Sequence, residues 1–412
     1  MRGTPKGLRL HIGIFGRRNV GKSALLNALT RQDVSIVADQ AGTTTDPVEK
    51  AMELLPLGPV LFIDTAGIDD VGALGQQRVE RTRRMIDRCD VGILTVGAGA
   101  WGRYEEELCA ELQRREIPVI AVFNQTDRGS PTPELLARLA ELRTPTVSTV
   151  ATEGQGLGEL RTALIEAAPD GFINAPTLAS DLVPPGGLAV LVVPIDLEAP
   201  KGRLILPQVQ TIRDLLDGDA YCMVVKEREL RDALERLRRP PDLVVTDSQA
   251  FLKVAADTPR DVPLTSFSIL FARYKGELLA LVDGALAIES LRPGDRVLVA
   301  EACSHHPIGD DIGRVKIPRW LTQYVGGRLE FDTIQGHDFP ADLGRYRLII
   351  QCGSCTLNRR EVLSRLMRAR AAGVPFTNYG LAIARSLGIL RRALEPFPAA
   401  HALVERHEQA RL

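Results

Sequence analysis

The stretch GRRNVGKS, residues 16–23, decides the fold of the first part of this chain. It matches the pattern G-x-x-x-x-G-K-[S/T], with the apolar run LRLHIGIF (8–15) before it and the helical pattern KSALLNALT after it. Glycines let backbone N–H groups curve around phosphate oxygens, and the dipole of a helix N-terminus attracts the same anion. The stretch therefore predicts a strand, a phosphate-binding loop and a helix in that order.

The residue types in this loop suit a nucleoside triphosphate held together with Mg²⁺. Gly16 and Gly21 allow the tight turn. Lys22 is expected to neutralise the β- and γ-phosphates, and the Ser23 hydroxyl is expected to ligate magnesium. The alternative is a glycine-bounded turn that carries Lys-Ser by chance, and the flanking strand and helix argue against it.

Two further motifs end apolar runs and complete a guanine-nucleotide site. In DTAG, Asp64 can reach the magnesium through water and Gly67 can meet the γ-phosphate. In NQTD, Asn124 and Asp127 are placed to read a purine edge. The Asp127 carboxylate only accepts hydrogen bonds, so it suits the N1–H and 2-amino donors of guanine and rejects adenine. In this order, the three motifs resemble those of the translation-factor class of small GTPases.

That resemblance implies further roles. Thr44, in the switch loop AGTTTD (41–46), is expected to ligate magnesium in preference to the threonines beside it. Asn19 stands where potassium-activated members carry an asparagine, which implies K⁺ near the β- and γ-phosphates. Ala151, in VATEGQGLGEL, is the best candidate for a backbone N–H that contacts the base. The expected catalytic residues are Lys22, Thr44, Asp64 and Gly67.

Two departures from the pattern of these GTPases affect the expected activity. Gln125 replaces the usual lysine of N-K-x-D, so stacking over the base and nucleotide affinity should be weaker. Ile68 follows DTAG where many GTPases carry a catalytic glutamine. We therefore expect slow intrinsic hydrolysis of GTP to GDP, stimulated by a cation such as K⁺ or by a partner.

Apolar runs alternate with helical patterns along the whole chain, which predicts an α/β protein with mostly parallel sheets. The polar, proline-containing stretch 168–187 is typical of a linker. We expect a P-loop small-GTPase domain at 1–172, a second parallel α/β domain at 181–268 and a third at 270–412. A long helical segment is expected at 270–291, leading into the third block.

Composition excludes several classes of protein. The formal net charge is −1, so neither nucleic acid nor an anionic membrane surface is an expected partner. The longest apolar runs, such as LAVLVVPI (188–195), are far shorter than the ~20 residues that span a bilayer. The N-terminus lacks the features of a secretory signal, and six cysteines are too few for a disulfide scaffold, so a cytoplasmic protein is expected.

Three cysteines are expected to converge in the third domain. Cys303 and Cys352 follow apolar runs predicted as strands of one parallel sheet, whose carboxyl ends share an edge. Cys355 lies one turn further on, at the expected start of a helix whose dipole favours a thiolate. His305 lies two residues beyond Cys303. From spacing alone, an iron–sulfur cluster, a zinc ion and redox or inert thiols all stay open.

The remaining cysteines and histidines have simpler expected roles. Buried packing is expected for three cysteines outside this group, namely Cys89, Cys109 and Cys222. His11 is expected in the core or at the edge of the first sheet, while His306 and His337 are expected in loops.

Together, the GTPase motifs, the middle α/β block and the C-terminal C-x-H…C-x-x-C pattern resemble the HydF family of FeFe-hydrogenase maturation GTPases. The stretches AGTTTDPVEKAMEL, LPQVQTIRDLLD and VPFTNYGLAIA also look like segments of this family. The resemblance implies that Cys303, Cys352 and Cys355 ligate a 4Fe–4S cluster with one iron open to an exchangeable ligand. Gln351 stands where the family often has histidine, which leaves His305 or a non-protein ligand for that iron.

The same resemblance implies the biological role. The protein would be a scaffold and carrier of the di-iron precursor of the hydrogenase active site. Two radical-SAM maturases would build this precursor, apo-hydrogenase would receive it, and the middle block would form a homodimer. A ribosome- or tRNA-associated GTPase with a structural zinc domain is the alternative function, and a thiol-redox enzyme that uses Cys352 and Cys355 is a third.

Overall fold

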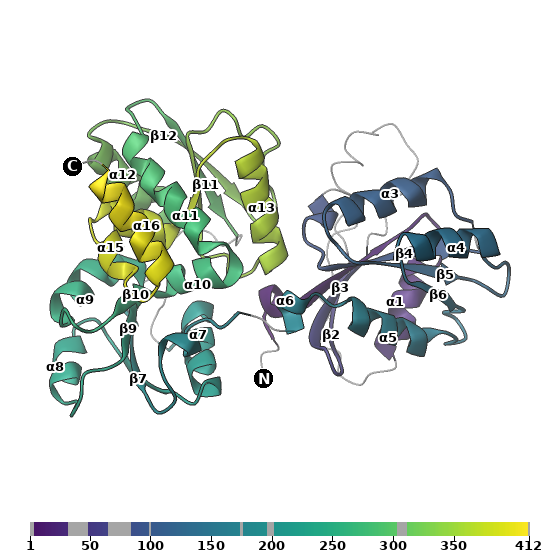
Figure 1. Ribbon diagram of the computed structural model, residues 1–412, viewed down its shortest axis with the longest axis horizontal. Helices are drawn as coiled ribbons and strands as arrows, with labels where there is room; N and C mark the ends of the chain where they lie inside the picture. Colours follow the sequence, from purple (N-terminus) through teal and green to yellow (C-terminus); the bar gives the residue numbers. More distant parts are fainter. Residues whose placement is uncertain are drawn as a thin grey trace. The chain divides into compact units, whose positions relative to one another are not determined.

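The computed structural model describes residues 4–31, 48–64, 84–98, 100–173, 176–195, 202–302 and 311–410. The chain folds into two compact units, Met1–Ala175 and Pro176–Leu412 (Figure 1). The second unit contains both of the C-terminal α/β blocks, and the domain boundaries expected within it stay predictions.

In the described part of the first unit, six strands form one sheet in the order β2-β3-β1-β4-β5-β6. Every pairing is parallel except that of β2 with β3, an antiparallel hairpin at the edge that the sequence reading missed. The segment VEKAMEL is charged and only partly buried, so it lacks the apolar run that marks the other strands. The strands are β1 (Leu10–Phe15), β2 (Val48–Leu54), β3 (Gly58–Asp64), β4 (Val91–Gly97), β5 (Val119–Asn124) and β6 (Thr146–Thr149).

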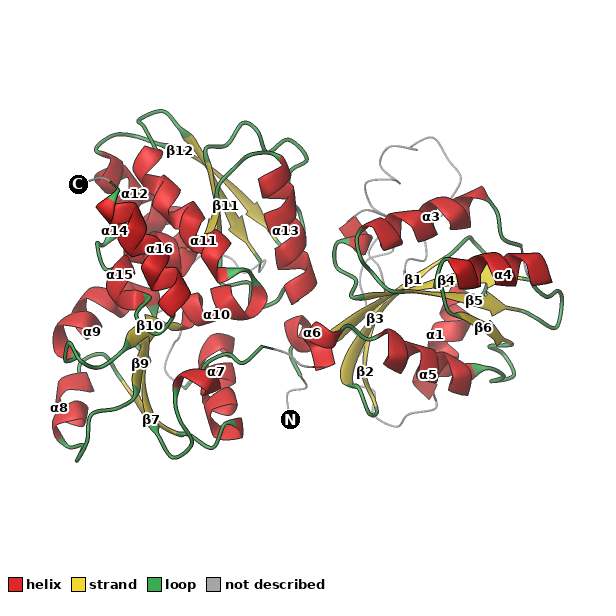
Figure 2. Cartoon of the chain, viewed as in Figure 1, coloured by secondary structure: helices red, strands yellow, loops and turns green. Residues whose placement is uncertain are grey.

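Helices cover both faces of this sheet (Figure 2). Leucines of α1 (Lys22–Arg31) and α5 (Leu157–Ala167) pack on one face, while those of α3 (Arg103–Arg114) and α4 (Pro133–Glu141) pack on the other. Two short helical turns, η1 (Lys6–Leu8) and α6 (Asp170–Ile173), lie near the ends of the unit. The expected P-loop α/β fold is confirmed for this unit.

The second unit contains two four-stranded sheets within its described residues, both entirely parallel. The first has the order β10-β9-β7-β8, with strands β7 (Leu188–Val192), β8 (Tyr221–Val225), β9 (Leu243–Thr246) and β10 (Leu264–Ser266). The second has the order β12-β11-β13-β14, with strands β11 (Arg296–Glu301), β12 (Glu330–Gln335), β13 (Leu348–Gln351) and β14 (Phe376–Asn378). Parallel α/β architecture is thus confirmed here as well.

One hydrophobic core joins the two sheets of this unit, because buried residues of β7, β9, β11 and β13 belong to a single cluster with the helices around them. No helix in the described ranges is long and apolar enough to cross a membrane. The α-helices are α7 (Leu206–Asp217), α8 (Leu230–Glu235), α9 (Phe251–Asp257), α10 (Phe267–Lys275), α11 (Leu278–Leu286), α12 (Ile317–Val325), α13 (Arg359–Ala371), α14 (Tyr379–Ser386), α15 (Leu390–Ala393) and α16 (Pro398–Gln409). Shorter turns are η2 (Ser180–Leu182), η3 (Ser248–Ala250), η4 (Ala287–Ser290) and η5 (Ile312–Lys316).

The long helical segment expected at 270–291 is helical over most of its length, but it is divided into two helices and a short turn. Helix α10 begins earlier, where the Ser266 hydroxyl accepts a hydrogen bond from the Ile269 N–H, and it ends at Lys275. Gly276 interrupts the helix with an extended backbone, and a Cβ there would lie 2.9 Å from the Ala272 carbonyl oxygen. The chain then restarts as α11, so Lys275 occupies the junction of two helices.

Candidate functional site

The phosphate loop lies between the end of β1 and the start of α1, as the sequence predicts, and its two glycines are sterically required. Gly16 has φ +143°, and a Cβ on it would meet the Thr95 carbonyl oxygen of β4 at 2.2 Å. Gly21 has φ +89°, and a Cβ there would meet the Asn124 side-chain nitrogen at 2.3 Å. Any side chain at these positions would push the loop away from the sheet.

Lys22 and Ser23 begin α1, and their side chains contact different parts of the site. The buried Lys22 ammonium donates to the backbone carbonyls of Gly16 (2.5 Å) and Arg17 (2.8 Å), so it lies across the loop. The Ser23 hydroxyl donates to the Asp64 carboxylate at 2.8 Å, at the end of β3. An ammonium beside the loop and a hydroxyl–carboxylate pair next to it are the groups that a magnesium nucleotide requires.

Asn124, at the end of β5, joins three loops of the site. Its amide nitrogen donates to the Val20 carbonyl at 2.9 Å, and its amide oxygen accepts from Thr149 Oγ1 and from the Ala151 N–H, both at 3.1 Å. In this structure the Ala151 N–H donates to Asn124. Its contact with a base stays a prediction. The Asp127 carboxylate is 46% exposed and therefore open to a ligand.

Gln125 connects the guanine-reading loop to the phosphate loop without a charge. Its amide nitrogen donates to the Asn19 carbonyl at 3.2 Å, and both residues have left-handed backbones, with φ of 60° and 64°. Asn19, the predicted K⁺ ligand, is exposed. Thr44 and Gly67 lie outside the described residues.

The C-x-x-C pair follows β13 in the second unit, and hydrogen-bond donors surround its first sulfur. Cys352 Sγ accepts from the Ala302 N–H at 3.1 Å and from the Ser354 N–H at 3.4 Å, with the Gln351 amide nitrogen at 3.6 Å. N–H groups directed at sulfur are typical of thiolate metal sites. Ala302 is the residue before Cys303 in the sequence.

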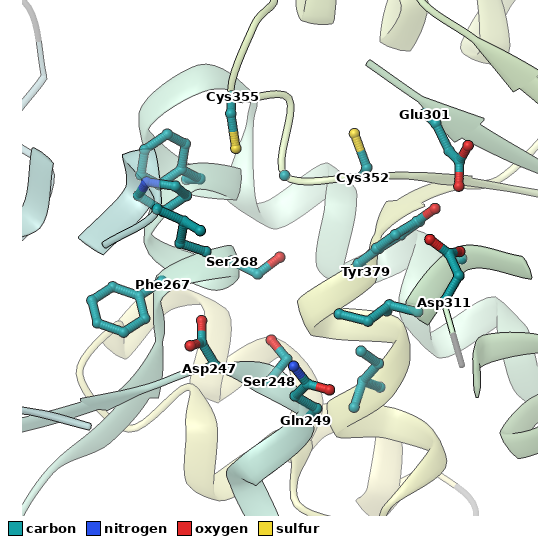
Figure 3. Close-up of a pocket in the computed structure, with 17 residues that line it drawn as sticks. Asp247, Ser248, Gln249, Phe267, Ser268, Glu301, Asp311, Cys352, Cys355 and Tyr379 are labelled. Atoms are coloured by element: carbon teal, nitrogen blue, oxygen red, sulfur yellow. The ribbon is translucent and has the colours of Figure 1, made fainter. Parts of the chain in front are cut away.

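A cavity of about 190 Å³ opens beside the two thiols (Figure 3). Cys352 and Cys355 lie on one rim, and residues that follow β9 lie across from them. The carboxyl ends of strands from both sheets meet here, which is where parallel α/β sheets bind ligands. The polar residues that line it include Asp247, Ser248, Ser268, Glu301, Asp311 and Tyr379.

Gln351 is held away from the cavity by two strong contacts. Its amide nitrogen donates to the Ala300 carbonyl and its amide oxygen accepts from Arg365, both at 3.0 Å. Arg365 in turn pairs with Glu361 at 3.0 Å, and Glu361 contacts His337 in the turn after β12 at 2.9 Å. The side chain of Gln351 is therefore part of this buried network, and the expectation that it is not a metal ligand stays a prediction.

The placement of Cys355 at the start of a helix is wrong. Helix α13 begins at Arg359, because the Asn358 side chain caps it by accepting from the Glu361 N–H at 3.1 Å. Burial, followed by the charge of Cys352, raises the pKa of Cys355 to about 12 even though the residue keeps some exposed surface. The thiol is thus protonated at neutral pH, and a bound metal would have to displace its proton.

The other predicted ligands, Cys303 and His305, lie outside the described residues, as does His306, which is expected in a loop. Within the described ranges, no group of three or more His, Cys, Asp or Glu residues is gathered to hold a metal ion. Two thiols at one cavity, with Cys303 next to a residue that contacts Cys352, are nevertheless a soft donor set that fits an iron–sulfur cluster or zinc.

The buried roles expected of the other thiols and of His11 are largely confirmed. Cys89 and Cys109 are buried in the first unit, whereas Cys222 is half-buried against the core of the second. The ring nitrogens of His11 contact the carbonyl oxygens of Arg88 (3.1 Å) and Lys6 (3.0 Å). These residues belong to packing and not to a site.

One residue near the thiols, Lys275, is not predicted by the sequence analysis. Lys275 is 1% exposed, and its ammonium donates to carbonyls of the loop that carries Cys355. The available signal was a lysine within the otherwise apolar pattern FSILFARYKG.

Three known families match parts of the chain. The family described as "Hydrogen maturase F dimerization domain" matches residues 178–276, and "Hydrogen maturase F tetramerization domain" matches residues 277–396. A third family, "50S ribosome-binding GTPase", matches residues 11–125. The two hydrogen maturase F domains together cover more than half of the chain.

Individual relatives match the first unit alone. The tRNA modification GTPase MnmE of Synechococcus sp. (strain JA-3-3Ab) is 39% identical over 170 residues, which are 39% of this chain and 34% of that protein. MnmE of Nostoc sp. is 36% identical over 171 residues, 40% of this chain and 36% of that protein. The chain thus spans about a third of the length of these relatives. Among solved structures, the G domain of the T. maritima FeoB iron transporter is 23% identical, covers 39% of this chain and 99% of that chain, and has a TM-score of 0.31.

The first prediction concerns Gln125, a neutral amide that replaces the usual lysine of N-K-x-D beside the expected base site. Gln125→Lys should tighten GDP binding about two- to fivefold, because a cation over an aromatic face adds about 0.5–1 kcal/mol at an exposed site. Titration with a fluorescent GDP analogue measures this change. Ala137→Lys, on the exposed side of α4, is the matched control and should leave the affinity unchanged. Equal affinities for Gln125→Lys and wild type would remove Gln125 as the cause of weak binding.

Proposed function

This chain belongs to the hydrogen maturase F family, and from that premise we propose that it is a GTPase that carries a 4Fe–4S cluster for FeFe-hydrogenase maturation. The observation that carries the proposal is the pair of thiols at a cavity where the strands of two sheets end, on the same chain as a magnesium-nucleotide loop. The similarity to MnmE is limited to the first unit, so the role in tRNA modification named for those proteins is not proposed here.

The GTPase domain binds GTP and Mg²⁺, and its residues are proposed to have separate roles. Lys22 would neutralise the β- and γ-phosphates, while Ser23 and Asp64 would hold the magnesium, the latter through water. We assign Thr44 to the magnesium and Gly67 to the γ-phosphate from their motifs. Hydrolysis is proposed to be slow, because Ile68 stands where a water-orienting glutamine is usual.

The thiol site would hold the cluster through Cys303, Cys352 and Cys355. Such a cluster supplies an iron that is open to an exchangeable ligand, for which His305 or a non-protein group is proposed. The protein's own contribution is a preformed loop that directs N–H groups at Cys352 and a cavity beside both described thiols. The di-iron precursor, the radical-SAM maturases that supply it and the apo-hydrogenase that receives it are proposed cargo and partners.

A cytoplasmic location is proposed for this function. No disulfide joins the described cysteines, and Cys352 and Cys355 are thiols. A reducing compartment keeps such a pair available for metal.

The edge strand β8 is proposed as the surface of a homodimer. It ends the first sheet of the second unit, and Tyr221 (66% exposed) and Val224 (44% exposed) present apolar surface there. Exposed apolar residues on α7, next in sequence to β8, include Val209 and Leu216. An unpaired apolar edge of this kind favours pairing with another strand, and a second copy of the same chain supplies one.

Iron content tests the cluster proposal. The wild-type chain, purified without oxygen and supplied with iron and sulfide, should bind about four irons and show the absorption of a 4Fe–4S cluster. Cys352→Ser should lose most of this iron because it removes a ligand, whereas Cys222→Ser, in strand β8, should keep it. A colourless wild-type protein that contains one zinc per chain would contradict the proposal and favour a structural zinc domain.

Potassium dependence tests the role of Asn19. GTP turnover should be clearly faster in KCl than in NaCl at the same ionic strength, because K⁺ adds positive charge near the β- and γ-phosphates. Asn19→Ala should lower turnover in KCl to the level seen in NaCl. Equal wild-type rates in the two salts would mean that Asn19 does not hold K⁺.

Oligomeric mass tests the edge-strand dimer. The double variant Tyr221→Lys/Val224→Lys should halve the mass measured by light scattering, because two like charges would face each other across the new pairing. Leu252→Lys, at a position 54% exposed on α9, is the control and should keep the wild-type mass. A double variant with the wild-type dimer mass would place the interface elsewhere.

A further inference from the structure

Lys275 is a buried cation that the proposed function has not used. It ends α10, 1% exposed, with its ammonium 5.7 Å from the centre of the Phe271 ring. Burial of a lysine is costly unless hydrogen bonds and opposite charges compensate it. We therefore expect groups near the Lys275 ammonium that compensate its burial.

The hydrogen bonds of Lys275 all reach one loop. Its ammonium donates to the carbonyl oxygens of Ser354 at 2.8 Å and Leu357 at 2.5 Å, with that of Cys355 at 3.5 Å. Ser354 has a left-handed backbone with φ 54°, a conformation that is costly for a residue other than glycine. The ammonium thus holds a strained loop in the shape that carries both thiols.

The thiol pair becomes the nearest source of opposite charge to the Lys275 ammonium once a bound metal displaces the thiol protons. Among the described residues, no carboxylate forms an ion pair with its ammonium, and Glu361 is already paired with Arg365 and His337. Burial lowers the pKa of Lys275 to about 8, and the groups that oppose this shift when they are negatively charged are Cys355 first, Cys352 second and then Glu361.

The loop lies between two cavities. Cys352 and Gly353 line the 190 Å³ cavity and also a small cavity of about 10 Å³, whose wall includes Lys275 and Gln351. Lys275 lines the small cavity and is not among the residues that line the large one. Its charge can therefore act on the thiols without occupying the space beside them.

We propose that Lys275 is the positioning residue of the thiol site, which fixes the C-x-x-C loop and supplies the positive charge that balances its thiolates when they hold a metal. The proposal rests on the proposed function as far as the metal is an iron–sulfur cluster, but it applies to any cation held by these thiols. Thiolates that bind a metal bring negative charge into a partly buried site. A fixed cation beside them stabilises the thiolates over the thiols and raises the reduction potential of a bound cluster.

Two measurements on one set of variants test this role. The metal-free chain is titrated with Co²⁺ alone, and thiolate-to-cobalt absorption reports its affinity; the cluster-loaded chain is titrated for its midpoint potential. Lys275→Gln keeps an N–H donor without the charge, Lys275→Met removes both, and Lys275→Arg keeps the charge. Lys253→Gln is the control, since Lys253 is an exposed residue paired with Asp257 on α9.

The three variants distinguish the effect of the positive charge of Lys275 from the effect of its hydrogen bonds on the shape of the loop. Lys275→Gln should weaken Co²⁺ binding about tenfold, the lower range for loss of a residue that supports metal ligands, and should make the midpoint potential more negative. Lys275→Met should weaken Co²⁺ binding further because the loop also loses its donor, while Lys275→Arg should keep a potential near that of wild type. Lys253→Gln should match wild type in both measurements.

Each contrary outcome has a defined meaning. A wild-type chain that binds neither Co²⁺ nor a cluster contradicts the thiol metal site itself. Wild-type binding that Lys275→Gln and Lys275→Met leave unchanged overturns only the role of Lys275. Loss of folding in all three Lys275 variants, judged by thermal unfolding against Lys253→Gln, would show a purely structural lysine and would also overturn the assignment.

Discussion

Parallel strands end at a common edge of their sheet, and both candidate sites of this chain depend on that constraint. In the first unit, the phosphate loop follows β1, while Asp64 and Asn124 end β3 and β5 of the same sheet. In the second unit, Cys352 follows β13 and Glu301 ends β11. Residues far apart in the sequence are brought together because the strands before them run in the same direction.

Each edge also requires a side chain that satisfies the polar backbone of its loops. Asn124 does this in the first unit, where one amide serves the Val20 carbonyl and the Ala151 N–H, and also accepts from the Thr149 hydroxyl. Lys275 does it in the second unit, where one ammonium serves the carbonyls of the thiol loop. Unmet backbone groups at a buried edge would cost about 1–3 kcal/mol each, so these two residues stabilise the sites before any ligand arrives. The difference between them is charge: the amide is neutral, and the ammonium suits an anionic ligand set.

The sequence predicted the parts of this structure that local patterns control. Apolar runs indicated most strands, and glycine spacing indicated the phosphate loop, where Gly16 and Gly21 adopt positive φ and have no room for a side chain. It missed β2 and β12, because both are charged and only partly buried. It also misplaced the start of α13, since Asn358 caps that helix three residues after Cys355. The contact of Lys275 with a loop about eighty residues away depends on tertiary packing, which no spacing rule reports.

The central claim is that the thiol pair and the cavity beside it hold an iron–sulfur cluster. X-ray diffraction from crystals grown without oxygen, with data on both sides of the iron absorption edge, tests it most directly. A bound iron–sulfur cluster should give an anomalous iron peak within bonding distance of the Cys352 and Cys355 sulfur atoms. A peak at that position that appears only above the zinc edge, or none at either edge, would contradict it.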